Sequence, residues 1–153
     1  AKVPVFDDWM QRVRKRTGVF LVPADKQGVM ALFDLLKNNK LIAVLPDQEP
    51  SRKSGVFAPF YAQPALTGKL IGDLAVKHPE SPMLCCYAKR MADGNYEVVF
   101  KPAKEEVRNA DPVISAMALN QSIEECVSDC PEQYQWSYKR FRLQPEGKST
   151  FYK

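Results

Sequence analysis

The chain has 153 residues, of which 45% are hydrophobic and 26% are charged, and its formal net charge is +4. These proportions are typical of one globular domain and exclude a collagen-like fibre or a disordered tail. The continuous apolar run over residues 41–45 is far shorter than the roughly 18 residues that a membrane-spanning helix needs. The small excess of positive charge permits a phosphate group, an acidic protein or an anionic membrane surface as partner without requiring one.

The first third of the chain alternates between helical and strand patterns. The spacing of apolar residues predicts a helix over residues 5–16 and a short buried strand over 19–22. A second helix is expected over 26–38, with Asp25 as its N-cap. Residues 41–45 are continuously apolar, which is typical of a parallel strand covered on both faces.

The middle of the chain contains one long connection and one hairpin. Prolines and a glycine interrupt residues 46–66, which we expect to form an irregular, functional or mobile connection. A helix is predicted over 67–77. The turn residues 93–95 join two apolar runs, 83–89 and 96–100, into a β-hairpin.

A long helix is predicted over residues 112–130, with Asp111 as N-cap and Pro112 at the first helical position. Its inward face would consist of Ile114, Met117, Ala118, Ile123 and Val127. The alternation of helices with apolar strands indicates an α/β domain, a layered sheet with flanking helices. We expect residues 1–153 to form one unit.

Histidine and cysteine give little indication of catalysis. The single histidine, His78, lies at the end of a predicted helix, where the helix dipole favours it. The four cysteines are too few for a disulfide scaffold and poorly placed for a zinc site, so we expect buried, reduced thiols and no metal. They are Cys85, Cys86, Cys126 and Cys130.

Asp47 and Gln48 are the most suggestive polar pair, because they directly follow the predicted strand over 41–45. Ligands bind at the carboxyl ends of strands in open α/β sheets, where these side chains would orient a polar substrate. The alternative is a proline-bounded turn in which Asp47 only stabilises the backbone.

Three further segments each allow two interpretations. Four basic residues at the end of the first helix, Arg12, Arg14, Lys15 and Arg16, would hold phosphates or form a solvated helix end. The apolar stretch 55–61 would pack into the core or line a ligand channel. The tail, residues 131–152, mixes aromatic and basic side chains and would be a strap over the core or a nucleic-acid surface.

Taken in order, these pieces resemble the C-terminal half of the lipid A biosynthesis lauroyl/myristoyl acyltransferases, which belong to the lysophospholipid acyltransferase superfamily. The resemblance extends over about residues 5–152. The matching pieces are Val13-Arg14 with Gly18, residues 35–37, 46–48, 55–57, 59–61 and 64–67, and in the tail residues 131–134, Trp136, 140–141 and 145–147.

The resemblance implies an enzyme of lipopolysaccharide biosynthesis at the cytoplasmic face of the inner membrane of a Gram-negative bacterium. Its members move a fatty acyl chain from acyl carrier protein onto a hydroxyl of a lipid A precursor, without a metal or organic cofactor. The alternative is a non-catalytic module that binds phosphorylated lipid or an anionic membrane surface. Neither reading involves nucleic acid.

The catalytic motif of the family is a histidine followed, at the fifth position, by Asp or Glu, and it acts as a base with its orienting carboxylate. Here His78 is followed at that position by Met83. We therefore expect no catalytic residue in this chain, which would be a soluble and inactive C-terminal fragment of the domain. The motif and a membrane anchor would precede residue 1.

The resemblance also assigns roles to individual residues. Arg14, with Arg16 nearby, matches the basic block that would hold an acceptor phosphate. The residues that would line the acceptor pocket are Asp47, Gln48, Gly55, Val56 and Phe57.

Overall fold

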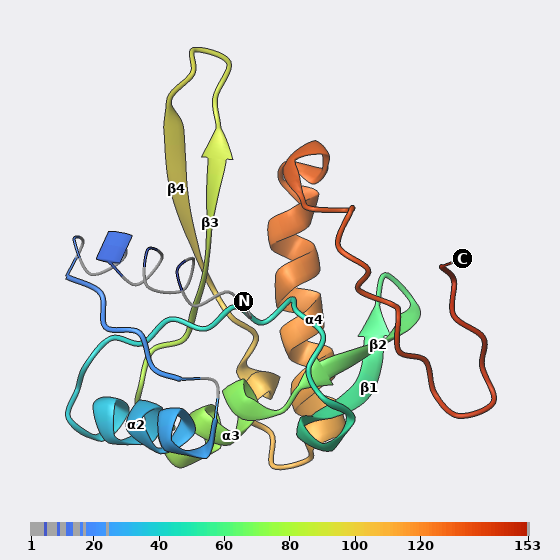
Figure 1. Ribbon diagram of the computed structural model, residues 1–153, viewed down its shortest axis with the longest axis horizontal. Helices are drawn as coiled ribbons and strands as arrows, with labels where there is room; N and C mark the ends of the chain where they lie inside the picture. The colour runs from blue at the N-terminus through green and yellow to red at the C-terminus, as the bar shows by residue number, and fades with distance from the viewer. Residues whose placement is uncertain are drawn as a thin grey trace. The chain divides into compact units, whose positions relative to one another are not determined.

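The computed structural model describes Val5, Trp9, Arg12, Val13, Arg16 and residues 18–23 and 25–152. The chain divides into two compact units, Ala1–Ile42 and Ala43–Lys153. Each unit is described by itself below (Figure 1). The expectation that the whole chain is one portion of a larger acyltransferase domain stays a prediction.

The first unit contains helix α2, Lys26–Lys37, which confirms the second predicted helix. The carboxylate of Asp25 accepts a hydrogen bond of 3.0 Å from the backbone N–H of Gly28, so the N-cap is the one that the sequence indicates. Leu32 is buried. The helix predicted over residues 5–16 lies largely outside the described residues.

Neither predicted buried strand of the first third forms, and this corrects the sequence analysis. Residues 19–22 and 41–45 are not assigned to any strand. Phe20 is 89% exposed and Leu41 is 97% exposed. A strand requires a neighbour that accepts and donates its backbone hydrogen bonds, and no described strand lies alongside either run. Apolar composition without that neighbour leaves an exposed, irregular segment.

The second unit holds the remaining regular elements. In chain order these are β1 (Gly55–Phe60), β2 (Gln63–Gly68), α3 (Leu70–Lys77), β3 (Leu84–Arg90), β4 (Tyr96–Pro102) and α4 (Pro112–Ser128), with 3-10 turns at Arg52–Ser54, Glu105–Arg108 and Pro131–Gln133. The strands form two separate antiparallel pairs, β1–β2 and β3–β4. In Figure 1, α4 stands between the two hairpins.

The β1–β2 hairpin occupies much of the segment for which we expected irregular structure. Prolines are rare inside strands because they cannot donate to the ladder, yet Pro59 lies directly opposite Pro64. The turn residues Tyr61 and Ala62 have φ values of 46° and 60°. This left-handed conformation is usual for Gly, Asn or Asp in such turns, so neither the strands nor the turn has its ordinary sequence pattern.

The β3–β4 hairpin and α4 confirm their predictions. Gly94 takes a φ of 86° in the turn of the hairpin. The carboxylate of Asp111 accepts 2.8 Å from the N–H of Val113 and caps α4. Of the predicted inward face of α4, Ala118, Ile123 and Val127 are buried, whereas Ile114 and Met117 are 37% exposed. The mixed α/β class is confirmed, and a layered acyltransferase-like sheet stays a prediction.

The core of the second unit lies between α4 and the β1–β2 hairpin. Its largest buried side chain is Phe60, at 1% exposure. The tail packs rings against it, with Tyr134 and Phe141 at centroid distances of 6.3 and 6.1 Å. This arrangement favours the strap interpretation of the tail. Within the residues described, no helix is long and apolar enough to cross a membrane.

Candidate functional site

The polar loop, residues 46–50, is fixed to the tail through Glu49. One carboxylate oxygen of Glu49 accepts 2.6 Å from the backbone N–H of Leu143. The other accepts from the guanidinium of Arg142, at 3.0 Å from Nε and 2.8 Å from Nη2. The Glu49 N–H donates 2.7 Å to the hydroxyl of Tyr138. Because the Glu49 side chain is only 1% exposed, these bonds replace water and hold the loop in one position.

Arg140 attaches the tail to the β1–β2 hairpin and to α4. Its side chain is buried, at 3% exposure. It donates 2.6 Å to the carbonyl of Leu66 and 2.9 Å to the hydroxyl of Thr67, and Asn120 accepts at 3.5 Å. The guanidinium also lies 5.7 Å from the centre of the Phe60 ring. Burial lowers the pKa of Arg140. The hydrogen bonds and the aromatic face offset part of the lost hydration, whereas Nε is buried without a hydrogen-bond partner.

Asp47 lies within electrostatic range of the same tail residues. Burial raises the pKa of Tyr134 to about 12, and the negative charge of Asp47 adds to that rise. The same charge acts on Arg140, where it opposes the lowering of the pKa by burial. The negative charge of the half-buried Asp47 therefore acts on a phenol and on a buried cation of the tail.

The start of β1 packs against the end of the polar loop. A Cβ on Gly55 would lie 2.6 Å from Cγ of Pro50 and 2.9 Å from the carbonyl of Thr67, so only glycine fits this contact. The Arg52 guanidinium lies 5.8 Å from the Phe57 ring centre and donates 3.0 Å to the carbonyl of Gln144.

The structure therefore brings most of the predicted pocket residues into one region of the second unit. Asp47 is half-buried and Gln48 is exposed, and Gly55, Val56 and Phe57 are half-buried on the adjoining strand. Glu49, Arg140 and Arg142, which fix this region, are not among the site residues predicted from the sequence. No local signal marks them, because their partners in the polar loop, the tail and the β1–β2 hairpin lie 73 to 94 residues away along the chain.

The predicted phosphate-binding arginines belong to the first unit. Arg14 lies outside the described residues. Arg16 is described and exposed. Both assignments stay predictions.

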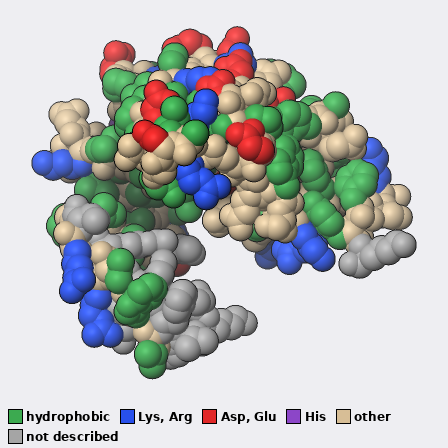
Figure 2. All heavy atoms as spheres, turned by 90° about the horizontal axis from the view of Figure 1, so that it is seen from above, with side chains coloured by type: hydrophobic (Ala, Val, Ile, Leu, Met, Phe, Trp, Pro, Cys, Tyr) green, Lys and Arg blue, Asp and Glu red, His purple; other side chains and the backbone are tan. Residues whose placement is uncertain are grey.

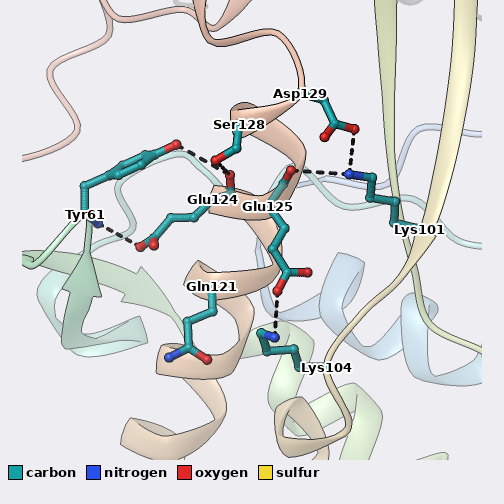
Figure 3. A pocket seen from close by; sticks show the side chains of 8 residues that line it. All are labelled: Tyr61, Lys101, Lys104, Gln121, Glu124, Glu125, Ser128 and Asp129. Atoms are coloured by element: carbon teal, nitrogen blue, oxygen red, sulfur yellow. Dashed lines mark hydrogen bonds and ion pairs between the residues drawn. The ribbon is translucent and has the colours of Figure 1, made fainter.

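A second polar region, which the sequence analysis missed, lies on the exposed side of α4 (Figure 3). A pocket of about 670 Å³ is lined by Tyr61, Lys101, Lys104, Gln121, Glu124, Glu125, Ser128 and Asp129. Lys101 pairs with Asp129 at 2.5 Å and Lys104 with Glu125 at 2.7 Å.

These ion pairs connect β4 and the residues that follow it to α4 and its C-cap, and they neutralise both lysines of the pocket. The remaining carboxylate, Glu124, accepts a hydrogen bond of 2.7 Å from the backbone N–H of Tyr61. The ion pair with Lys101 and the hydroxyl of Tyr87 lower the pKa of Asp129. Acidic and basic side chains also lie close together, with hydrophobic ones between them, on the face shown in Figure 2. The pocket is therefore best explained as a set of ion pairs that hold the hairpin to α4.

The cysteines are free thiols. Burial raises the pKa of Cys126 to about 11 and raises that of its neighbour Cys85. Cys130 is buried, whereas Cys86 is exposed on the opposite side of β3, which corrects the expectation that all four are buried. No group of three or more potential metal ligands occurs in the part of the chain that the structure describes.

His78 ends α3, as predicted. Its backbone N–H donates 3.0 Å to the carbonyl of Leu74, and its side chain is half-buried. Met83 stands five positions further on, so the described geometry offers His78 no carboxylate at the spacing of the family motif.

Comparison with known proteins identifies the class. The model of the bacterial lipid A biosynthesis acyltransferase family matches residues 1–143. The chain therefore belongs to the bacterial lipid A biosynthesis acyltransferase family, as the resemblance indicated.

Individual relatives agree with this assignment. The chain is 27% identical over 152 residues to the lipid A biosynthesis lauroyltransferase of Escherichia coli (strain K12), covering 95% of this chain and 47% of that protein. It is 27% identical over 146 residues to the palmitoleoyltransferase of the same organism, covering 95% of this chain and 47% of that protein. It is also 27% identical over 152 residues to the myristoyltransferase of that organism, covering 98% of this chain and 46% of that protein. The chain spans about half the length of these curated relatives.

Proposed function

We propose that these residues are the C-terminal part of an enzyme that transfers a fatty acyl group from acyl carrier protein to a hydroxyl of a lipid A precursor. The observation that carries the proposal is the family match over residues 1–143, at about half the length of the relatives. The relatives are named for lauroyl, palmitoleoyl and myristoyl transfer.

In this proposal the polar loop binds the acceptor. The Asp47 carboxylate accepts a hydrogen bond from an acceptor hydroxyl, and the Gln48 amide contributes a second polar contact. Glu49, which is bonded to Leu143 and Arg142, keeps both residues in register with the tail. Gly55, Val56 and Phe57 form the apolar side of the pocket, and Arg14 and Arg16 hold phosphate.

The reaction requires a base that this chain does not supply. The acceptor hydroxyl loses its proton as its oxygen attacks the thioester carbonyl. The carbon–sulfur bond then breaks, and the released thiolate of the carrier takes up a proton. His78 lacks a carboxylate at the family spacing, so we propose that the base precedes residue 1 and that the chain alone is inactive.

The proposal includes a location and partners. The complete enzyme lies at the cytoplasmic face of the inner membrane, held by an anchor that also precedes residue 1. Acyl carrier protein is acidic, and the net charge of +4 favours its encounter with this chain. The reaction uses neither a metal nor an organic cofactor.

The test begins with the coding sequence upstream of residue 1. We expect a His-x4-Asp or His-x4-Glu motif there, and acyl transfer by the longer protein in detergent with an acyl carrier protein donor. The 153-residue chain should show no transfer. Asp47→Asn in the longer protein should lower kcat/KM at least about tenfold, because it replaces the charged oxygen that accepts from the acceptor hydroxyl with a weaker, neutral amide oxygen.

Asp34→Asn, an exposed carboxylate on α2, serves as the matched control and should leave kcat/KM unchanged. Equal rates for Asp47→Asn and the unaltered protein would show that the pocket assignment is wrong. A protein without the upstream motif that binds anionic vesicles but transfers no acyl group would instead establish the alternative, a lipid-binding module.

A further inference from the structure

The β3–β4 hairpin has two faces of different character. The inner face contacts α4: the hydroxyl of Tyr87 bonds to Asp129, Lys101 pairs with the same carboxylate, and the thiol of Cys85 lies against that of Cys126. These contacts account for the side chains that point toward α4. Among the described residues, the other side of both strands has no neighbour of this kind.

The outer face is almost entirely apolar. The register places Leu84 opposite Pro102, Cys86 opposite Phe100, Ala88 opposite Val98 and Arg90 opposite Tyr96. Every one of these eight residues is exposed. Leu84, Val98 and Phe100 are 57%, 56% and 63% exposed. Arg90, at the turn end, carries the one charge of this face.

Such a face has the composition of a buried surface. Antiparallel sheets with one face in water normally carry polar residues on that face. A contiguous apolar patch on a soluble protein usually marks a contact. A two-stranded hairpin is also only marginally stable without further strands or a covering element. The outer face therefore requires a partner, and that partner must be apolar because only Arg90 offers a charge.

The length of the relatives indicates what that partner is. The chain covers 47% of the lauroyltransferase to which it is similar. We infer that the outer face of β3–β4 is an internal surface of the complete domain, covered by the half of the acyltransferase that precedes residue 1. This inference rests on the proposed function, because it requires these residues to be part of a longer enzyme.

Residues 41–45 support the same conclusion from another element. They have the composition of a buried strand, yet Leu41 and Leu45 are 97% and 72% exposed. The half that precedes residue 1 would supply strand neighbours, which among the described residues neither this run nor the free edges of the hairpin have. The other partners that an apolar face would take are a lipid bilayer and a second copy of the chain.

Cys86 makes the inference testable without altering the protein, because it lies on the outer face. The rate of alkylation of Cys86 by a maleimide is measured by mass spectrometry in the 153-residue chain and in the longer protein, both in the same detergent. We expect at least about tenfold slower labelling in the longer protein. Equal rates in the two proteins would overturn the inference.

A substitution gives an independent readout. Phe100→Glu should change the thermal unfolding midpoint of the 153-residue chain by no more than about 2 °C. The same substitution should lower the midpoint of the longer protein by at least about 6 °C, because the charge would be buried there. Val113→Glu, on the 48% exposed Val113 of α4, is the matched control and should change neither midpoint.

Every outcome decides the question. If Phe100→Glu lowers the midpoint of the 153-residue chain as well, the chain covers this face itself and the inference is wrong. If labelling slows only when vesicles are added, or only at high protein concentration, the partner is lipid or a second copy. If the longer protein transfers acyl groups but its Cys86 is accessible, only the inference is refuted. If its Cys86 is protected but the protein transfers no acyl group, only the proposed function is refuted.

Discussion

The two hairpins of the second unit have the same topology but opposite environments. Phe60 at the end of β1 is 1% exposed, whereas Phe100 in β4 is 63% exposed. The β1–β2 hairpin is covered by α4 and by the tail, which returns to place Arg140 against Leu66 and Thr67. The β3–β4 hairpin contacts α4 with one face only. How far the side chains of a hairpin are buried therefore depends on which later segments of the chain pack against it. The pairing of the two strands does not determine this burial.

The local sequences of the hairpins would suggest the reverse. β1–β2 contains Pro59 and Pro64 in register and a turn without glycine, which are poor features for a hairpin. β3–β4 has an Asp-Gly-Asn turn and β-branched and aromatic residues, which favour one. Tertiary packing therefore stabilises the weak hairpin and leaves the strong one partly uncovered.

The sharpest test of this difference removes the same atoms from each hairpin. Phe60→Ala should lower the free energy of unfolding by about 3–5 kcal/mol, because it opens a cavity in the core. Phe100→Ala should lower it by less than about 1 kcal/mol, because the ring is already in water. Urea unfolding followed by circular dichroism measures both. A loss of similar size from the two variants would contradict the comparison.

The next largest effect concerns the tail that covers β1–β2. Arg140→Met keeps the length of the side chain but leaves the carbonyl of Leu66 and the hydroxyl of Thr67 without their donor, so we expect a loss of about 2–3 kcal/mol in urea unfolding. Lys139→Met, at the exposed neighbouring position, should change stability by less than about 0.5 kcal/mol. A tail that does not contribute to the fold would give the same value for both variants.

The smallest effect is a difference in how stability depends on pH. It compares Cys126 of α4, which packs against the inner face of β3–β4, with Cys86 on the outer face. Burial raises the pKa of Cys126 to about 11, so the folded state favours the protonated thiol. Its contribution to stability is complete below the ordinary thiol pKa of about 9 and is lost as the pH rises toward 11. Stability of the unaltered chain should therefore fall more steeply over this range than that of Cys126→Ala. Cys86→Ala, on the outer face, should retain the steep fall in stability. A pH profile for Cys86→Ala as shallow as that of Cys126→Ala would contradict this prediction.

Much of the fold follows from local signals. The caps at Asp25 and Asp111 and the turn at Gly94 are where the sequence predicts them, because each depends on residues within a few positions. α2, α4 and the β3–β4 hairpin were predictable for that reason. The β1–β2 hairpin was not, because its prolines and its left-handed turn conceal a pairing that packing enforces.

The candidate site divides in the same way. Asp47 and Gln48 attract attention in the sequence because they follow an apolar run, although that run is not a strand in the structure. The bonds that fix them were not predictable. Glu49 joins Leu143 across 94 positions, and no periodicity in the sequence indicates so distant a contact.

The sequence by itself determined the family, the α/β class, the helix caps, one hairpin and the absence of the family's histidine motif from these residues. The tertiary structure alone decided which hairpin is buried, that Glu49 and Arg140 fix the polar loop and the tail, and that β3–β4 exposes an apolar face. The physical reason is the range of the interactions. Caps and turns are closed by neighbours along the chain, whereas burial and buried charge pairing depend on segments that meet only when the chain has folded.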